Sequence, residues 1–408
     1  MTPIPSWRAF IAVWCRVALL SVGGPAGQIA VMHRLLVAER RWVSDADFLH
    51  ALNFCMVLPG PEAQQLATYL GWRQRGVVGA LVSGGLFIAP GLLSILLLSW
   101  LTLSWQGYGL WQAALAGLQA AVVAVMAAAL LRLGRRTLVD RPRQGLAVAA
   151  LLALAVGLPF PLVLVFGALA GLRWFVPTDL SSPQSSIQWR HALKVLGVGG
   201  LVWALPMLVI VLAFGPSHVL AALGVFFAKV SLLTFGGAYA VLGYVTEVAV
   251  EGHQWVAAAD MMDALAFAEA TPGPLIQAVQ HIGYVAGWRA PQPWTPGAMA
   301  LAGALITTWS VFVPSITLVL AGAPSVEVLG QRPRVAAALQ GMGAVVVGVI
   351  AHLALWFGLQ VLWPASGFSV SALVLMGLAA LLLGPFQRGP LLTLLLCAVV
   401  AVAWQGLS

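Results

Sequence analysis

Residues 58–65 read LPGPEAQQ, and residues 271–278, 213 positions later, read TPGPLIQA; both stretches interrupt long apolar runs. Proline lacks an amide hydrogen and restricts the residue before it, so Pro-Gly-Pro ends one helix and begins another. A second pair of breaks is expected at GGPAG (23–27) and at FGGA (235–238). The sequence therefore predicts four helix breaks, arranged as two copies of one pattern.

The duplication extends over most of the chain. Gln64 matches Gln277 at the same offset, and further along the offset becomes 224, so that Pro90 matches Pro314. The added residues fit in a Pro-rich stretch at 289–297. These matches predict a first repeat at 1–180, a linker with one additional apolar helix at 181–215, and a second repeat at 216–408.

The composition places both repeats in a membrane. Of the 408 residues, 61% are hydrophobic and 8% are charged, whereas soluble proteins carry about 25% charged residues. Such a chain cannot cover a water-soluble globule, which excludes soluble enzymes and nucleic-acid partners, and its hydrophobicity excludes disorder. The length leaves room for about 10–13 membrane segments, which must be helical because backbone groups in lipid have to bond internally. We therefore predict an all-α polytopic membrane protein.

The basic residues predict that the two repeats have opposite orientations. Arginines gather at 34–41, 73–75 and 132–143, whereas the matching connections at 246–256 and 356–367 carry no Lys or Arg. Basic residues mark cytoplasmic loops, so the repeats are inverted in the membrane. This arrangement is typical of secondary transporters, which bind substrate near the midplane. A duplication without transport is the alternative.

The same loops constrain the segment at 48–72. Because the basic connections on both sides of it belong to the cytoplasmic face, this segment cannot cross the membrane once. We expect a re-entrant helical hairpin, or two short passes, broken at residues 58–61.

Broken helices at membrane depth expose backbone amides, which suit an anion. Two different breaks, each duplicated, favour such a site over simple kinks, which remain the alternative. Gln64 and Gln277 would direct side-chain donors towards the same place. The predicted substrate-binding residues at the breaks are Gly23, Gly24, Pro25, Pro59, Gly60, Pro61, Gly236, Gly237, Pro272, Gly273 and Pro274.

Two basic side chains lie inside apolar segments at matching repeat positions, Arg16 and Lys229. A cation within a span costs at least about 2.5–3.5 kcal/mol and usually faces a cavity or a partner. The pair is expected to offer two positive charges to one dianion. The alternative is that both side chains extend to the membrane surface.

Four residues are candidates for proton coupling. Glu269 lies deep in an apolar run, and Glu62 follows the first Pro-Gly-Pro directly. Glu62 could instead cap its helix. His50 and His281 are second choices, because a lone histidine is more often hydrogen-bonded than functional.

Several strings resemble the long-chain chromate ion transporter family over essentially the whole chain. They are GGPAGQIA (23–30), RRWVS (40–44), LPGPEAQQLATYLGW (58–72), TFGGAYAVL (234–242) and ATPGPLIQ (270–277). The resemblance implies two tandem chromate-transporter domains and chromate efflux. It also implicates Gln28, together with the glycines and prolines of the first-repeat breaks, Glu62 and Gln64. One departure is Val22, where the family pattern has Phe; Phe235 keeps that pattern in the second repeat.

The expected function is chromate export by alternating access across a bacterial inner membrane, driven by the proton-motive force. The expected partners are chromate or a similar tetrahedral oxyanion, membrane lipids, a proton or counter-anion, and a second copy in a homodimer. A sulfate carrier, a chromate/sulfate exchanger and a passive anion channel are the alternatives. GxSxG and HExxH strings are missing, which argues against an intramembrane hydrolase, and the three cysteines follow no ligand spacing, so neither a cofactor nor a metal is expected.

Overall fold

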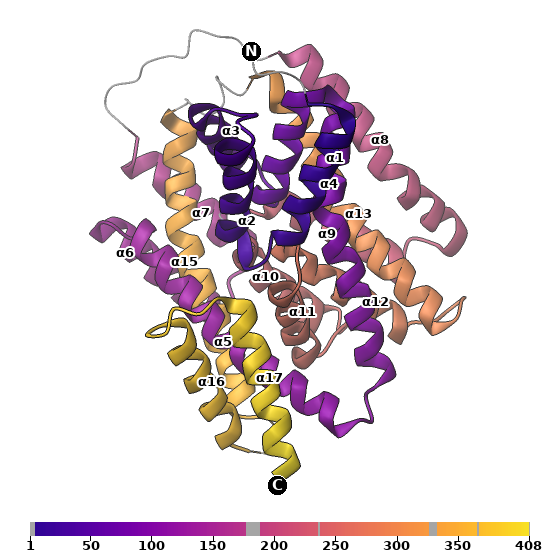
Figure 1. The fold of residues 1–408 in the computed structure, drawn as a ribbon, viewed down its shortest axis with the longest axis vertical. Helices are drawn as coiled ribbons and strands as arrows, with labels where there is room; N and C mark the ends of the chain where they lie inside the picture. Colours follow the sequence, from indigo (N-terminus) through magenta and orange to yellow (C-terminus); the bar gives the residue numbers. More distant parts are fainter. Residues whose placement is uncertain (1–4, 177–187, 236, 326–332, 365–366, 408) are drawn as a thin grey trace.

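The computed structural model describes residues 5–176, 188–235, 237–325, 333–364 and 367–407, and within these ranges all regular structure is helical (Figure 1). The helices before the linker are α1 (Trp7–Leu20), α2 (Gly24–His33), η1 (Arg34–Glu39), α3 (Asp45–Val57), α4 (Glu62–Ser104), α5 (Gly109–Thr137), α6 (Arg141–Ala155) and α7 (Phe160–Trp174). Helix α8 (Trp189–Phe214) follows. The remaining helices are α9 (Val219–Leu233), α10 (Ala238–Thr246), η2 (Glu247–Gly252), α11 (Ala258–Ala270), η3 (Leu275–Gln277), α12 (Ala278–Arg289), α13 (Pro296–Gly322), η4 (Ala323–Ser325), α15 (Pro333–Leu362), α16 (Val370–Leu383) and α17 (Pro390–Leu407).

Many of these helices are apolar enough for a membrane. In the described part of the chain, α4, α5, α8, α15 and the continuous stretch Pro296–Ser325 are long and apolar enough to cross it, and four more apolar helices are shorter. Helix α8 packs against α13 and α9 and leaves most of its leucines exposed, as a lipid-facing helix does. The prediction of an all-α polytopic membrane protein is confirmed.

Helix α4 consists of two arms that fold back on each other. Its backbone leaves helical geometry at Arg75 and Gly76, where Gly76 has a φ of 64°. Ser83 Oγ donates to the carbonyl oxygen of Ala67 at 2.8 Å, although these residues would lie about 24 Å apart in a straight helix. The basic connection expected at 73–75 is therefore a tight turn.

Each Pro-Gly-Pro forms the tip of a helical hairpin. Helix α3 and the first arm of α4 make one hairpin, and an ion pair of 2.8 Å between Asp47 and Arg73 joins its open end. Helices α11 and α12 make the other, joined at its open end by Asp260 and Arg289, also at 2.8 Å. The two Pro-Gly-Pro breaks lie where the sequence predicts them, and the breaks before α2 and α10 begin slightly earlier than predicted, because α1 ends at Leu20 and α9 at Leu233. In Figure 1 the first hairpin lies in the upper half and α10 and α11 lie below it.

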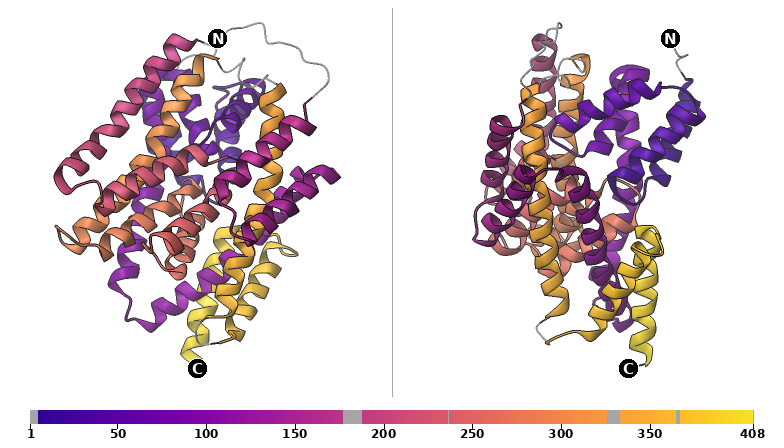
Figure 2. Two further views of the ribbon diagram at one scale, coloured as in Figure 1. Left: turned by 180° about the vertical axis from the view of Figure 1, so that it is seen from behind. Right: turned by 90° about the vertical axis from the view of Figure 1, so that its left-hand side faces the viewer.

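The two repeats are intertwined. Helices α6 and α7 pack against α15, whereas α16 and α17 pack against α5 (Figure 2). Gly117 on α5 and its repeat counterpart Gly341 on α15 permit these contacts, because a Cβ on either would overlap the backbone of the crossing helix. Helices α5 and α15 are also repeat counterparts, and they run antiparallel: the end of α5 and the start of α15 line one cavity. Matching helices therefore point in opposite directions.

Candidate functional site

The four helix breaks meet at the centre of the molecule through two reciprocal hydrogen bonds. The Gly60 amide donates to the carbonyl oxygen of Thr234 at 2.8 Å, and the Gly273 amide donates to that of Ser21 at 3.0 Å. Gly60 and Gly273 are repeat counterparts, as are Ser21 and Thr234. Each Pro-Gly-Pro tip is thus bonded to the first break of the other repeat.

The two predicted glutamines also connect the repeats. Gln64 Oε1 accepts from Ser315 Oγ at 3.0 Å, and Gln277 Nε2 donates to the carbonyl oxygen of Ile88 at 3.1 Å. Ser315 and Ile88 lie beside the prolines inside α13 and α4, which are themselves counterparts. These amides therefore hold each tip against the long helix of the opposite repeat.

Gln28 and the tip glycines complete this junction. Gln28 Nε2 donates to the carbonyl oxygen of Gly273 at 2.6 Å, which ties α2 to the second hairpin. Gly60 and Gly273 have φ values of 134° and 119°, which side-chain-bearing residues rarely adopt. A Cβ on Gly60 would also lie 2.7 Å from Ser315 Oγ.

The helices that start at the breaks lack side-chain caps. Helices α2, α4, α10 and η3 begin without a capping hydrogen bond from a side chain. Helices α5, α7 and α8 also lack one, whereas Ser6, Ser44 and Thr295 cap other helices. The first amides of α2, α4 and α10 can therefore serve a ligand. The tip amides cannot, because the opposite repeat already binds them. Gly236 lies outside the described residues.

A cavity of about 700 Å³ adjoins two of the breaks. We name it the Arg136 cavity. Glu62, the first residue of α4, and Phe235, in the break before α10, both line it. The rest of its lining is Asn53, Met56, Val57, Leu133, Arg136, Thr137, Val139, Arg143, Ala336, Leu339, Gln340, Met342, Gly343 and Val346.

Two arginines line this cavity, and Arg136 is the one that is free to bind a ligand. Arg143 is occupied by Asp140 and Gln340 and lies over the Phe175 ring, 4.4 Å from its centroid. Arg136 forms no direct ion pair with any residue that the structure describes, although Glu62 lies within range of its charge. The Arg136 guanidinium therefore faces open space beside a carboxylate.

A second carboxylate–arginine pair lies one turn back along α5. Glu269 is buried and accepts a hydrogen bond from the Tyr239 hydroxyl, and Arg132 lies within range of both groups. Residues i and i+4 share one helix face, so α5 presents Arg132 to Glu269 and Arg136 to Glu62. The sequence pattern predicts a loop at these arginines, but α5 continues to Thr137.

Other predicted residues lie elsewhere. Arg16 is exposed and pairs with Glu39 at 3.5 Å, Lys229 is exposed, and neither lines the Arg136 cavity. His50 is exposed. His281 is buried, and its Nδ1 lies 2.8 Å from Ser99 Oγ, which links α12 to α4.

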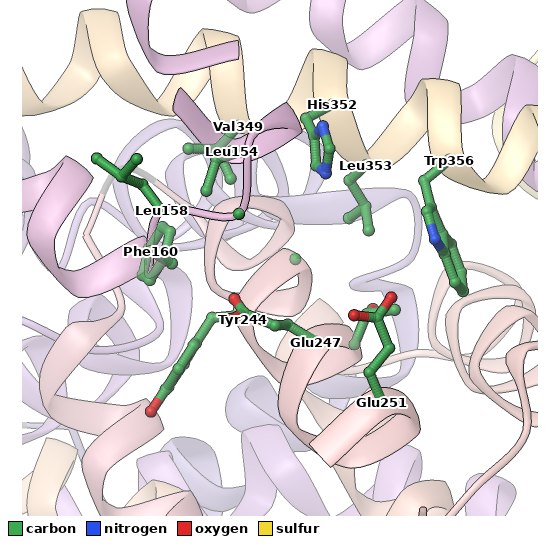
Figure 3. A pocket seen from close by; sticks show the side chains of 13 residues that line it. Leu154, Leu158, Phe160, Tyr244, Glu247, Glu251, Val349, His352, Leu353 and Trp356 are labelled. Carbon is green, nitrogen blue, oxygen red and sulfur yellow. The ribbon is translucent and has the colours of Figure 1, made fainter. Parts of the chain in front are cut away.

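A smaller cavity of about 270 Å³ has the opposite electrostatic character (Figure 3). Glu247 and Glu251 of η2 lie on one side of it, and His352 and Trp356 of α15 lie on the other. Burial and the neighbouring Glu251 carboxylate raise the pKa of Glu247. Two carboxylates make this cavity unsuitable for a dianion.

Metal chemistry has no visible basis in the described residues. Within these ranges no three His, Cys, Asp or Glu side chains gather where they could hold a metal ion. The chemistry of the central site is that of hydrogen bonds and ion pairs.

Broken apolar helices that surround a basic cavity define a polytopic membrane transport protein. Within this class, the profile of the chromate transporter family matches residues 8–172 and 221–402, and the chain belongs to this family. Membership supports chromate transport as its activity.

Curated relatives agree with this assignment. The chain is 34% identical to a chromate transport protein of Pseudomonas aeruginosa over 85% of its length and 80% of the relative. It is 29% identical to a chromate transport protein of Cupriavidus metallidurans over 85% of its length and 82% of the relative. A probable chromate transport protein of Synechococcus elongatus is 27% identical over 99% of this chain and 97% of its own. No solved structure matches the chain.

Proposed function

We propose that this protein is a secondary active transporter that exports chromate from the cytoplasm of a bacterium across the inner membrane. The substrate binds in the Arg136 cavity. The observation that carries this proposal is that one cavity joins an available arginine to the uncapped start of α4 and to Phe235 in the break before α10.

The chemistry of this cavity fits a tetrahedral dianion. A guanidinium offers two parallel N–H donors to an oxyanion, and helix starts add amides with a partial positive charge. Asn53, Thr137 and Gln340 supply neutral polar groups in the same lining. The cavity volume of about 700 Å³ leaves room for the anion and several waters.

The arrangement of the repeats supports alternating access. Helices α5 and α15, which match in sequence, run antiparallel. Each Pro-Gly-Pro tip bonds to the first break of the other repeat, and an ion pair joins the open end of each hairpin. We infer that the hairpins are re-entrant and enter from opposite faces. Exchange of the tip contacts would then open the site to one face at a time.

Glu62 provides a route for proton coupling. It shares the cavity with Arg136, so an anion bound there repels its ionised carboxylate. Anion occupancy and protonation of Glu62 are therefore coupled. Glu269 and Tyr239, beside Arg132, form the second coupled group.

Chromate flux in proteoliposomes tests the proposed function. Purified protein should move chromate against its concentration gradient when a pH gradient is imposed and the membrane potential is held at zero. Uphill movement excludes a passive anion channel, because a channel only dissipates gradients. Movement of sulfate without chromate would contradict chromate as the substrate and would support the related oxyanion carrier.

A further inference from the structure

A second polar cavity lies at the other end of α5 and α15. It has a volume of about 370 Å³, and we name it the Gln360 cavity. Gln119 from α5, Met262 from α11, Gln360 from α15 and Ser369 before α16 are among its lining residues.

The Gln360 cavity is the repeat counterpart of the Arg136 cavity. At the offset of 224 positions, four lining residues of one cavity match four of the other. The matched pairs are Ala116 with Gln340, Gln119 with Gly343, Thr137 with Val361, and Arg136 with Gln360. The pseudo-symmetry that joins the hairpin tips therefore also relates these two cavities.

The two cavities lie at opposite ends of two helices that can cross a membrane. Both are lined by α5 and α15, which are long enough to span it. Gln119 and Arg136 are 17 residues apart on α5, a rise of about 25 Å. The Arg136 cavity reaches the first hairpin tip at Glu62, whereas the Gln360 cavity is lined by Ala258, Ala259 and Met262 at the open end of the second hairpin.

The two cavities differ in the charge of their matching residues. Gln360 stands where the other repeat has Arg136, and Gly367 stands where it has Arg143. Gln119 Nε2 donates at 2.8 Å to Oδ1 of Asp263, a buried carboxyl group on α11. At the Gln360 cavity an oxyanion would therefore meet amide and hydroxyl donors. A carboxyl group lies nearby, and the lining contains no guanidinium.

We propose that the Gln360 cavity is a second, weaker oxyanion site, which opens on the face opposite the Arg136 cavity and releases the transported anion. This inference rests on the proposed function. Neutral hydrogen bonds hold a dianion less strongly than a guanidinium does. The charge difference between two related cavities therefore makes release easier at the Gln360 end, while the imposed gradients set the direction of net transport.

The test is to restore the missing charge. Chromate exchange is measured in vesicles of defined orientation. When chromate is added on the Gln360 side, Gln360→Arg should lower the half-saturating concentration at least tenfold. When chromate is added on the Arg136 side, the half-saturating concentration should stay unchanged. Gln112→Arg is the matched control, because it places the same charge at the same end of α5 but outside the cavity. This control should leave both values unchanged.

Cysteine labelling gives a second measurement that does not depend on flux. Arg136→Cys and Gln360→Cys, each in a background with Cys15, Cys55 and Cys397 replaced, should react with a membrane-impermeant maleimide from opposite sides. Reaction of both from one side would overturn the inference. If the wild-type protein transports chromate and folded Gln360→Arg has the same half-saturating concentration as the wild type, this inference alone is overturned. If the wild-type protein does not transport chromate, the proposed function is overturned as well.

Discussion

The amide of Gly60 is bonded at 2.8 Å to the carbonyl oxygen of Thr234, across the interface between two repeats. This contact and its counterpart between Gly273 and Ser21 use the only donor in each Pro-Gly-Pro tip, because proline has none. Each tip therefore stabilises the first break of the other repeat, and the starts of α2, α4 and α10 are left for a ligand. Both tips depend on glycine for this geometry.

Replacement of either tip glycine should disturb this junction. Gly60→Ala places a Cβ against Gln65 and Ser315 at a φ of 134°, and Gly273→Ala places one against Gln277 at 119°. Each change should lower the free energy of unfolding by about 1–3 kcal/mol and reduce chromate flux strongly. Thermal unfolding in detergent and proteoliposome flux measure the two effects.

Gly85→Ala is the control for this pair. Gly85 lies in the second arm of α4, and a Cβ there would meet no atom within 4 Å. The variant should retain wild-type stability and flux. If Gly60→Ala behaves in the same way, the tip contact is not essential.

The local features of the fold could be predicted from sequence, because proline and glycine act on their own backbone. The breaks at 23–27 and 58–61 required no knowledge of the partners. The partners of Gln64 and Gln277 could not be predicted, since they come from the opposite repeat. Repeat matching indicated that the glutamines are equivalent but not which helix each one contacts.

The basic residues of the site were harder to predict for a different reason. Arg16 and Lys229 interrupt apolar segments, and an interruption alone does not show which face a side chain occupies. In α1 the buried residues Phe10, Val13, Trp14 and Val17 follow helical spacing, which was the available signal that Arg16 lies on the outer face. Both side chains are exposed. Arg132 and Arg136 were assigned to a loop by their density, whereas their spacing of four residues is the helical signal that was missed.

Removal of the Arg136 charge should weaken oxyanion binding. A charge-assisted hydrogen bond contributes about 1.5–3 kcal/mol, so Arg136→Gln should raise the dissociation constant for chromate by roughly 10–150-fold. Arg136→Lys should lie between, because an ammonium cannot bind in bidentate fashion. Equilibrium binding to purified protein measures these values. Arg135→Gln, one residue away and outside the cavity lining, should bind as the wild type does; equal losses in both variants would assign the effect to net charge.

The Tyr239–Glu269 hydrogen bond should contribute to stability. Tyr239→Phe leaves the buried Glu269 carboxyl group without its donor, at a cost of about 1–3 kcal/mol. Tyr284→Phe is the control, because the structure shows no hydrogen bond from the hydroxyl of this tyrosine to any described residue. Thermal unfolding should separate the two variants, and equal melting temperatures would contradict the role of the bond.

The open end of the first hairpin should respond to acid. Burial alone would raise the pKa of Asp47, but Ser44 and the Arg73 charge outweigh it and lower this pKa below its usual 3.8. Stabilisation by Asp47 is therefore present at neutral pH and is lost as the pH falls through the lowered pKa. Both side chains are more than a third exposed, so the contribution is about 0.2–1 kcal/mol. Asp47→Asn should destabilise the protein at neutral pH and much less at about pH 3; a constant difference would point to lost packing instead.

Glu62→Gln should separate anion binding from the proton. An amide keeps the size of the carboxyl group but carries no charge, so a bound oxyanion meets no repulsion from it. The variant should bind sulfate with an affinity that is independent of pH, whereas wild-type affinity should fall up to tenfold per pH unit where Glu62 is ionised. Sulfate is the appropriate probe because chromate itself takes up a proton near neutral pH. Glu251→Gln, in the acidic cavity of Figure 3, should keep the wild-type pH dependence. If Glu62→Gln also keeps it, another group carries the proton, and Glu269 beside Arg132 is the next to replace.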